Sequence, residues 1–413
     1  MKNPVHPVRR LTAAALISAA VFEASAANFS SGSTGADGPL NVTSNTVVQL
    51  PADGVLNYTT ITVGVSNSLT FKRNVLNTPV YLLATGDVVI DGSINVNGGT
   101  GSVAPLSGGL GGPGGFDGGA GGFTSADNVL PGGAGMGPGG GLPGPGGNYN
   151  FNGAGAGAYG ARPPAANALD GVAYGSRLLI PLVGGSGGGG VNGDPNRGGG
   201  GGGGAVLVAS NTRITVSSTG SIVARSGEAV EVSRYNSGSG GAVRLVAPRV
   251  YGTGTLDVRS TTSTVNDQFR SGGAGRIRVD SIFKVEPTNP AGENLSLVFV
   301  PSPSASVGST MIVFPPSVPS LSIVSAAGQA IAEGALAPVQ VQLPFGSNTN
   351  QLITVRARNF GADVPIRVSL IPANGDPISY DTNIVNTAVN PAEVTVNAGF
   401  PLNALVNVQV WTR

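Results

Sequence analysis

The sequence predicts an all-β fold, a right-handed parallel β-helix with glycine-rich insertions that is followed by a small antiparallel β-sandwich. A pattern of short strands, in which apolar and polar residues alternate, repeats at residues 80–96, 203–226, 240–260 and 272–280. Repeats of roughly 20 residues are typical of a solenoid, in which each coil covers the apolar edge of the next. Many of the 68 glycines lie between residues 98 and 204, so this segment interrupts the coils.

The N-terminus has the pattern of a secretory signal peptide over residues 1–26. Lys2, Arg9 and Arg10 precede an apolar stretch, and residues 24–26 read Ala-Ser-Ala, which is a typical cleavage site. The apolar stretch is too short to span ~30 Å of hydrocarbon as a helix. We therefore expect a secreted protein, extracellular or at the cell surface, without a transmembrane span; the periplasm is the alternative location.

Four segments are expected in the chain. Residues 1–26 are the signal peptide, and the polar, turn-rich residues 27–54 are expected to cap the open end of the β-helix. Residues 55–315 form the β-helix, with the glycine-rich insertion at 98–202. Residues 316–413 form an immunoglobulin-like sandwich without a cysteine pair, because short alternating segments separated by Gly, Pro and Asn recur there. These segments are 339–343, 352–358, 366–370, 378–381, 394–396 and 406–411.

The glycine-rich insertion has too few side chains for a conventional core. Two interpretations stay open: a disordered loop, or extended polyproline-II-like strands lying against the solenoid, where glycine permits close backbone approach. The insertion leaves the solenoid at the same corner as residues 227–239 and 261–271. We expect that side to be the functional face, because solenoids usually carry binding surfaces on such loops.

Alignment of the repeats places arginines side by side. Arg244 and Arg278 share one outward position, and Arg225 and Arg259 share another. Since neighbouring coils are ~4.8 Å apart, aligned arginines repel unless a carboxylate or a bound anion lies between them. These residues therefore form either a binding strip for an anionic polysaccharide or a set of solvated arginines interleaved with Glu228, Asp257 and Asp280.

The aromatic residues of the insertion are the other candidates for ligand binding. Exposed rings on a glycine-rich surface stack on sugars, but rings also anchor such a segment to the solenoid wall, and anchoring is the preferred interpretation. The candidates for sugar binding are Tyr149, Phe151, Tyr159 and Tyr174.

Composition excludes several chemistries. The chain has no cysteine, and its one histidine, His6, lies in the predicted signal peptide, so Cys-His and Ser-His-Asp catalysis and histidine zinc sites are excluded. A net charge of +1 gives no field to recruit nucleic acid. The glycines match neither a calcium-binding nonapeptide repeat nor a phosphate loop. We predict no metal, no cofactor and no catalytic residue, since the acids do not converge in the aligned repeats. They are Asp87, Asp91, Glu228, Glu231, Asp257, Asp267 and Asp280.

The repeats resemble those of secreted bacterial glycine-rich parallel β-helix proteins, the pectin-lyase-like and adhesin-passenger solenoids. The resemblance covers roughly residues 58–280. It rests on VYLLATGDVVIDGSINVNGG (80–99), GGAVLVA (203–209), GGAVRLVAP (240–248), GTGTLDV (252–258) and GGAGRIRVD (272–280). Pectinase-like enzymes of this group use clustered aspartates with a histidine, or calcium-binding acids, and this chain has neither. The resemblance therefore implies a bacterial surface or matrix protein.

The sequence thus favours an exported, non-catalytic structural or adhesive protein that binds a polysaccharide or a cell-surface component, with self-association left open. The alternative is a polysaccharide hydrolase or lyase that works with carboxylates and arginines on a β-helix. A weaker third hypothesis is an ice-binding or crystal-binding surface, for which Thr60 and Thr62 alone do not form the expected threonine ladder.

Overall fold

The computed structural model describes residues 29–413 with gaps, and the predicted signal peptide lies outside the described residues. The gaps fall at 102–106, 126–127, 145–153, 165–167, 192–197, 229–235, 262–270, 284–295, 318, 336–337, 387 and 403.

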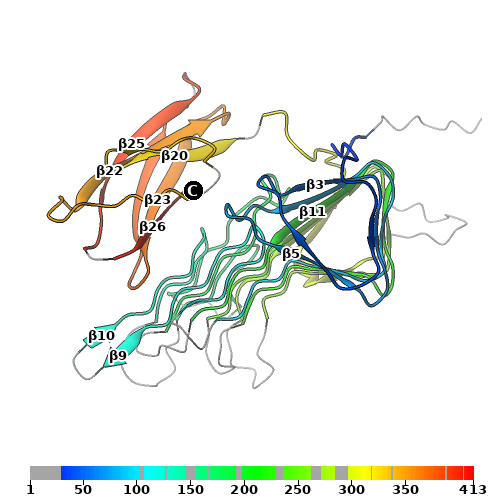
Figure 1. The fold of residues 1–413 in the computed structure, drawn as a ribbon, viewed down its shortest axis with the longest axis horizontal. Helices are drawn as coiled ribbons and strands as arrows, with labels where there is room; N and C mark the ends of the chain where they lie inside the picture. The colour runs from blue at the N-terminus through cyan, green and yellow to red at the C-terminus, as the bar shows by residue number, and fades with distance from the viewer. Residues whose placement is uncertain are drawn as a thin grey trace, which may run out of the picture.

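Three stacked parallel sheets form a solenoid in the first part of the chain (Figure 1). Sheet A contains β1 (Leu40–Val42), β4 (Ile61–Val63), β7 (Val88–Ile90), β12 (Arg213–Val216) and β15 (Arg249–Gly252). Sheet B contains β2 (Thr46–Gln49), β5 (Ser68–Lys72), β8 (Ser93–Asn95), β13 (Ser221–Val223), β16 (Thr255–Asp257) and β18 (Val298–Val300). Sheet C contains β3 (Val55–Tyr58), β6 (Val80–Ala84), β11 (Ala205–Ser210), β14 (Ala242–Ala247), β17 (Arg276–Ser281) and β19 (Ala305–Gly308). Successive strands of the chain visit the sheets in turn, as the repeats predict.

The core of the solenoid follows from the alternation of its strands. Ile61, Val88, Ile214 and Val250 are cross-strand neighbours in sheet A, and all four are buried. Residues of like kind stack in the same way in sheets B and C, where alternate side chains point inward. A one-residue slip would expose every one of these side chains, so the apolar pattern sets the register.

The described residues of the predicted cap, 29–54, include two strands of the solenoid itself. Strands β1 and β2 pair in parallel with β4 and β5, so these residues form the first coil of the solenoid. Farther upstream, Ser31 donates a hydrogen bond from Oγ to the carbonyl oxygen of Ala84 at 2.8 Å. This contact fixes the start of the described chain against sheet C.

The central strands of sheet C, β11 and β14, are buried on both faces. The outer face of β11 and β14 packs against a second apolar cluster that includes Tyr159, Leu179, Leu182 and Val313. Residues 311–314, which resemble a strand in sequence, cover this face instead of extending the sheet; the Phe314 ring lies 5.2 Å from that of Tyr81, centroid to centroid.

The described glycine-rich residues form a bundle of extended segments that projects from the solenoid (Figure 1). Residues 199–205 donate backbone hydrogen bonds to three neighbouring segments in rotation. Residues 199, 202 and 205 donate to the carbonyl oxygens of residues 119, 116 and 113. Residues 200 and 203 donate to those of residues 236 and 239, and residues 201 and 204 donate to those of residues 99 and 96. A period of three residues, with each bond made to another segment, is the pattern of polyproline II. The described part of the insertion therefore has the expected polyproline-II-like conformation, but its segments pack against one another and project from the solenoid instead of lying along it (Figure 1).

Close packing explains the glycines of this bundle. A Cβ atom on Gly199 or Gly202 would lie 2.0 or 1.9 Å from the carbonyl oxygens of Gly188 and Gly185. Because backbone lies on these sides, a side chain has no room to move into. The hairpin of β9 (Phe123–Ser125) and β10 (Asn128–Leu130) lies at the far end of the bundle (Figure 1).

The C-terminal part is an antiparallel β-sandwich. One sheet has the order β21-β20-β22-β25 and the other β24-β23-β26, and one apolar cluster fills the space between them. The strands are β20 (Ser320–Ala326), β21 (Gln329–Ala330), β22 (Asn350–Arg358), β23 (Val364–Pro372), β24 (Ile378–Ile384), β25 (Ala392–Gly399) and β26 (Val406–Thr412). A short 3-10 helix, η1 (Ser302–Ser304), precedes β19.

The sandwich also contacts the glycine-rich bundle. Gly375 donates its backbone N–H to the carbonyl oxygen of Gly132 at 2.9 Å. Asn374 donates from Nδ2 to the carbonyl oxygen of Pro131 at 2.9 Å, and Gly137 donates its N–H to Gln409 at 3.2 Å. The two parts of the chain are thus joined by contacts as well as by the linker.

Candidate functional site

The register of the parallel sheets brings the four predicted arginines together as two pairs. Arg244 and Arg278 are direct neighbours across β14 and β17. Arg225 and Arg259 each follow a sheet B strand by two residues, after the paired residues Val223 and Asp257. The alignment derived from the repeats is therefore confirmed, and one aspartate lies beside each pair.

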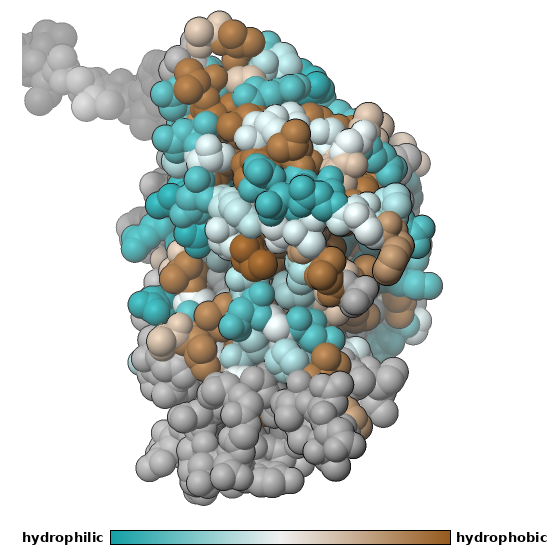
Figure 2. Space-filling model, turned by 90° about the vertical axis from the view of Figure 1, so that its left-hand side faces the viewer, coloured by the Kyte–Doolittle hydropathy of each residue, from teal (hydrophilic) through white to brown (hydrophobic). Residues whose placement is uncertain are grey.

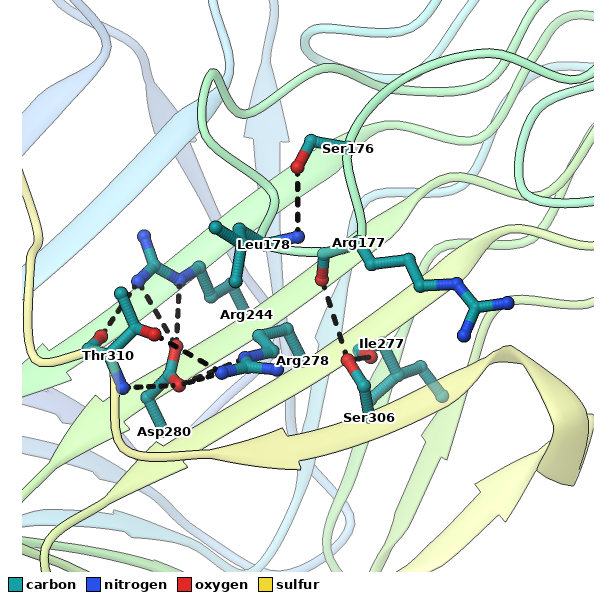
Figure 3. A network of polar contacts seen from close by, with 9 residues as sticks. All are labelled: Ser176, Arg177, Leu178, Arg244, Ile277, Arg278, Asp280, Ser306 and Thr310. Atoms are coloured by element: carbon teal, nitrogen blue, oxygen red, sulfur yellow. Dashed lines mark hydrogen bonds and ion pairs between the residues drawn. The ribbon is translucent and has the colours of Figure 1, made fainter.

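The first pair is an internal ion cluster with Asp280 and Thr310 (Figure 3). Arg244 Nη2 lies 3.1 Å from Asp280 Oδ2, and Arg278 Nη2 lies 2.6 Å from Oδ1 of the same carboxylate. The Thr310 N–H donates to Asp280 Oδ1 at 2.9 Å, and Arg244 donates to the Thr310 carbonyl oxygen at 3.1 Å. The cluster fastens residue 310 to the outer face of sheet C.

Burial of this cluster corrects one expectation. The side chains of Arg244 and Asp280 are 1% and 0% exposed, because residues 309–314 and the segment around Leu179 cover them. Burial lowers the pKa of Arg244, while Asp280 opposes that effect. Arg244 and Arg278 do not face solvent, so neither belongs to a surface strip for an anionic polymer.

Tyr159 and Tyr174 serve as anchors. Their ring centroids are 4.8 Å apart, and Tyr159 is fully buried. Tyr174 donates from Oη to the carbonyl oxygen of Gly184 at 2.6 Å, and Arg276 lies 5.5 Å from the centroid of the Tyr159 ring. Burial raises the pKa of both hydroxyls. Tyr159 is therefore not available to stack on a sugar, whereas Tyr149 and Phe151 lie outside the described residues.

The second pair is exposed. The side chains of Arg225 and Arg259 are 40% and 50% exposed, and both bind Asp257, which is 1% exposed. Arg225 Nε lies 2.8 Å from Asp257 Oδ2, and Arg259 Nη2 lies 2.8 Å from the same oxygen. Two guanidinium groups thus share one carboxylate, which leaves one net positive charge at the surface.

Opposing effects set the protonation of Asp257. Burial alone would raise the pKa of its carboxyl, but hydrogen bonds from Arg259 and Arg225 outweigh burial and hold the pKa below its usual value. The carboxylate therefore stays ionised and holds both guanidinium groups in fixed positions. An ordered guanidinium with free N–H groups is well suited to bind a carboxylate, sulfate or phosphate oxygen.

Sheet B extends this cluster into a row. Asn97 accepts a hydrogen bond at Oδ1 from the Arg225 N–H at 2.7 Å. Thr70 pairs with Asn95 in the neighbouring coil, so the same register places Lys72 beside Asn97, two residues farther along each coil. Lys72 is exposed. We call Lys72, Asn97, Arg225 and Arg259 the basic row; its members follow one another at ~4.8 Å, the spacing of the coils.

A row of hydroxyl groups runs along the same face of sheet B. Its members are cross-strand neighbours and partly exposed, whereas the alternate residues point into the core. They are Ser68, Ser93, Ser221 and Thr255. Ser221 donates to Ser93 at 3.2 Å, Oγ to Oγ. The face thus offers hydroxyl groups beside cationic groups, which together suit an acidic glycan.

The expected interleaving of the arginines with Asp257 and Asp280 is confirmed, whereas the sharing of one carboxylate by both arginines of a pair was not predicted. The signal lay in the spacings Asp257-x-Arg259 and Arg278-x-Asp280, because residues i and i+2 of a strand lie on the same face. Thr310 carries no such signal, since it reaches the cluster from a segment distant in the sequence. The covering of sheet C was missed for the same reason.

Among the described residues, no group of three or more acidic or histidine side chains could hold a metal ion. No helix within the described ranges is long and apolar enough to cross a membrane. Comparisons with protein-family models, with curated proteins and with solved structures give no match to this chain.

Proposed function

We propose that this chain is an exported, non-catalytic structural or adhesive protein of the cell surface or matrix, which binds an anionic polysaccharide along the basic row. One observation carries the proposal: Arg225 and Arg259 are 40% and 50% exposed, yet buried Asp257 holds both in place. Prepositioned guanidinium groups lose little conformational freedom on binding, which favours affinity. The signal-peptide pattern at residues 1–26 supports export.

The scaffold supports this role. The coils of a solenoid fix the spacing between successive members of the basic row, and this spacing is similar to that between successive residues of an extended sugar chain. A polymer that lies along the solenoid axis would therefore meet Arg225 and Arg259 with neighbouring acidic groups. Hydrogen bonds from the hydroxyl row would add to the contact.

The engagement of the acids supports a non-catalytic role. Asp87, Asp117, Asp257 and Asp280 each form an ion pair with an arginine. In neighbouring coils, Asp257 lies beside Val223 and Val300 rather than beside a second carboxylate. Glu231 and Asp267 lie outside the described residues. A hydrolase needs two carboxyl groups ~5–9.5 Å apart that can exchange protons. Each of these four carboxylates is instead engaged by an arginine, which favours a binding protein over a hydrolase on the solenoid.

An array of acidic and neutral glycans tests the proposal. The chain from Ala27 is compared with R225Q/D257N/R259Q, in which each charged side chain is replaced by a neutral one of similar shape. We expect the wild type to bind acidic glycans, with affinity that falls as salt rises, and the triple variant to lose this binding.

R213Q is the matched control. Arg213 forms an exposed ion pair with Asp87 on sheet A, and its loss changes the net charge by the same amount as the triple substitution. Binding should survive R213Q. Equal loss in both proteins would indicate bulk charge instead of the basic row, and acidic-glycan binding that persists in the triple variant would refute the site.

A further inference from the structure

Two loops project from the end of the sandwich that is remote from the linker. Residues 343–349 precede β22, and residues 400–402 and 404–405 follow β25. The Phe400 N–H donates to the Thr349 carbonyl oxygen at 2.9 Å, so the loops are adjacent. The linker enters β20 at Ser320, which pairs with the far end of β22. We call the described residues 343–349, 400–402 and 404–405 the distal loops.

The distal loops expose large apolar side chains. Phe345 is 108% exposed, Leu402 73% and Leu405 80%, while Leu352 and Ile378 nearby are also exposed. Figure 2, which views the molecule from the side of this end, shows several separate apolar groups among polar ones. These apolar side chains project from loops and not from a groove, so they are available for contact with another surface.

The surroundings of these side chains carry almost no charge. Residues 338–355 and 394–412 contain no Asp, Glu, Lys or Arg, and Asp376 is the charged residue on the neighbouring turn. The backbone of the loops is also partly satisfied from within. Ser347 donates its N–H to the Pro344 carbonyl oxygen at 3.1 Å, and Ala373 donates to that of Leu405 at 2.9 Å.

We propose that the distal loops insert Phe345, Leu402 and Leu405 into the interface of a lipid bilayer. A hydrocarbon phase accepts uncharged apolar side chains and penalises charged ones, and the tips of the distal loops carry no charge. Unpaired backbone groups are also penalised, so the apolar side chains would enter the membrane interface while the loop backbone stays at the headgroup level. Asparagine and serine side chains beside the tips, such as Asn348 and Ser347, suit the headgroup layer. Attraction arises from apolar burial rather than from basic residues, so zwitterionic lipid suffices. This inference is independent of the basic row.

Co-sedimentation of the chain from Ala27 with phosphatidylcholine vesicles tests the proposal. The wild type should bind with little dependence on salt. F345S and L402S/L405S should each weaken binding by roughly tenfold or more, since burial of one such side chain is worth about a decade in an equilibrium constant. R225Q/D257N/R259Q should bind vesicles as the wild type does.

V385S/V389S is the matched control. Val385 and Val389 are 64% and 61% exposed at the opposite end of the sandwich. Equal weakening by this variant, or no vesicle binding by the wild type, would overturn the proposal. Dimerisation without vesicles that F345S abolishes would identify a second copy of the chain as the occupant and would also overturn it.

A single-tryptophan protein gives a second readout. Trp411, the only tryptophan, lies in β26 near the opposite end of the strand from the distal loops. In F345W/W411F the new indole should shift its emission to the blue when phosphatidylcholine vesicles are added. Co-sedimentation without such a shift would place the contact elsewhere and contradict insertion.

Discussion

Two carboxylates in the described part of the solenoid, Asp257 and Asp280, are each shared by two arginines, and the burial of these arginines differs. Asp280 and its partners are buried, whereas the partners of Asp257 reach solvent. The repeats predict which arginines align, because the register follows from apolar alternation. They do not predict exposure, because the segments that cover sheet C come from residues 309–314 and from the glycine-rich insertion.

Asp280→Asn should strongly destabilise the solenoid. The substitution leaves the buried guanidinium of Arg244 without its carboxylate, and loss of one partner of a buried ion pair costs ~3–5 kcal/mol. Chemical denaturation measures the change. D87N, which removes the partner of exposed Arg213, should lower the free energy of unfolding by less than ~1 kcal/mol. Similar losses of stability in both variants would contradict a structural role for the internal ion cluster.

The contribution of Asp257 should depend on pH in a defined direction. Its folded pKa lies below the ordinary value of 3.8, so the folded state binds the proton less readily than the unfolded chain. The resulting stability is complete above about pH 5 and is lost as the pH falls through the folded pKa. The difference in unfolding free energy between wild type and D257N should therefore shrink below about pH 4. A constant difference down to pH 2 would refute this coupling.

The strands of the solenoid are predicted well from the sequence, and several other segments are not. Alternation with buried neighbours predicts β4, β6, β13 and β16 in their register. Residues 339–343 alternate as well, but they lie exposed between Pro338 and Pro344 and form no strand. The sequence did not predict β20. Alternation of apolar and polar residues indicates that one face of a segment is buried. It does not identify the partner strand, because long-range contacts determine the pairing.

The glycine-rich bundle should be intolerant of single methyl groups at its centre. Gly202→Ala places Cβ 1.9 Å from the Gly185 carbonyl oxygen, and we expect a loss of about 3 kcal/mol or more, at or beyond the upper range for over-packing. Thermal unfolding measures it. In the matched control Gly99→Ala, the nearest atom is the Leu110 oxygen at 3.3 Å, so the loss should be much smaller. Equal tolerance of the two substitutions would contradict close packing of backbone.

At the scale of the whole molecule, the sandwich is held beside the bundle by a few hydrogen bonds. N374A/Q409A removes the side-chain partners of Pro131 and Gly137 and should increase the radius of gyration measured by X-ray scattering. The control is Q340A/Q342A. Gln340 and Gln342 are exposed polar residues of the sandwich, and neither forms the hydrogen bonds to the bundle that Asn374 and Gln409 form. An unchanged radius in N374A/Q409A would mean that other contacts fix the sandwich.

Binding of an acidic glycan to the proposed site should protect backbone amides along the basic row from hydrogen exchange. The chain from Ala27 is measured with and without an acidic oligosaccharide selected by the array. We expect added protection around Asn97, Arg225 and Arg259, where sheet B meets the bundle. Protection confined to the sandwich or to the far end of the bundle, with none along the basic row, would contradict it.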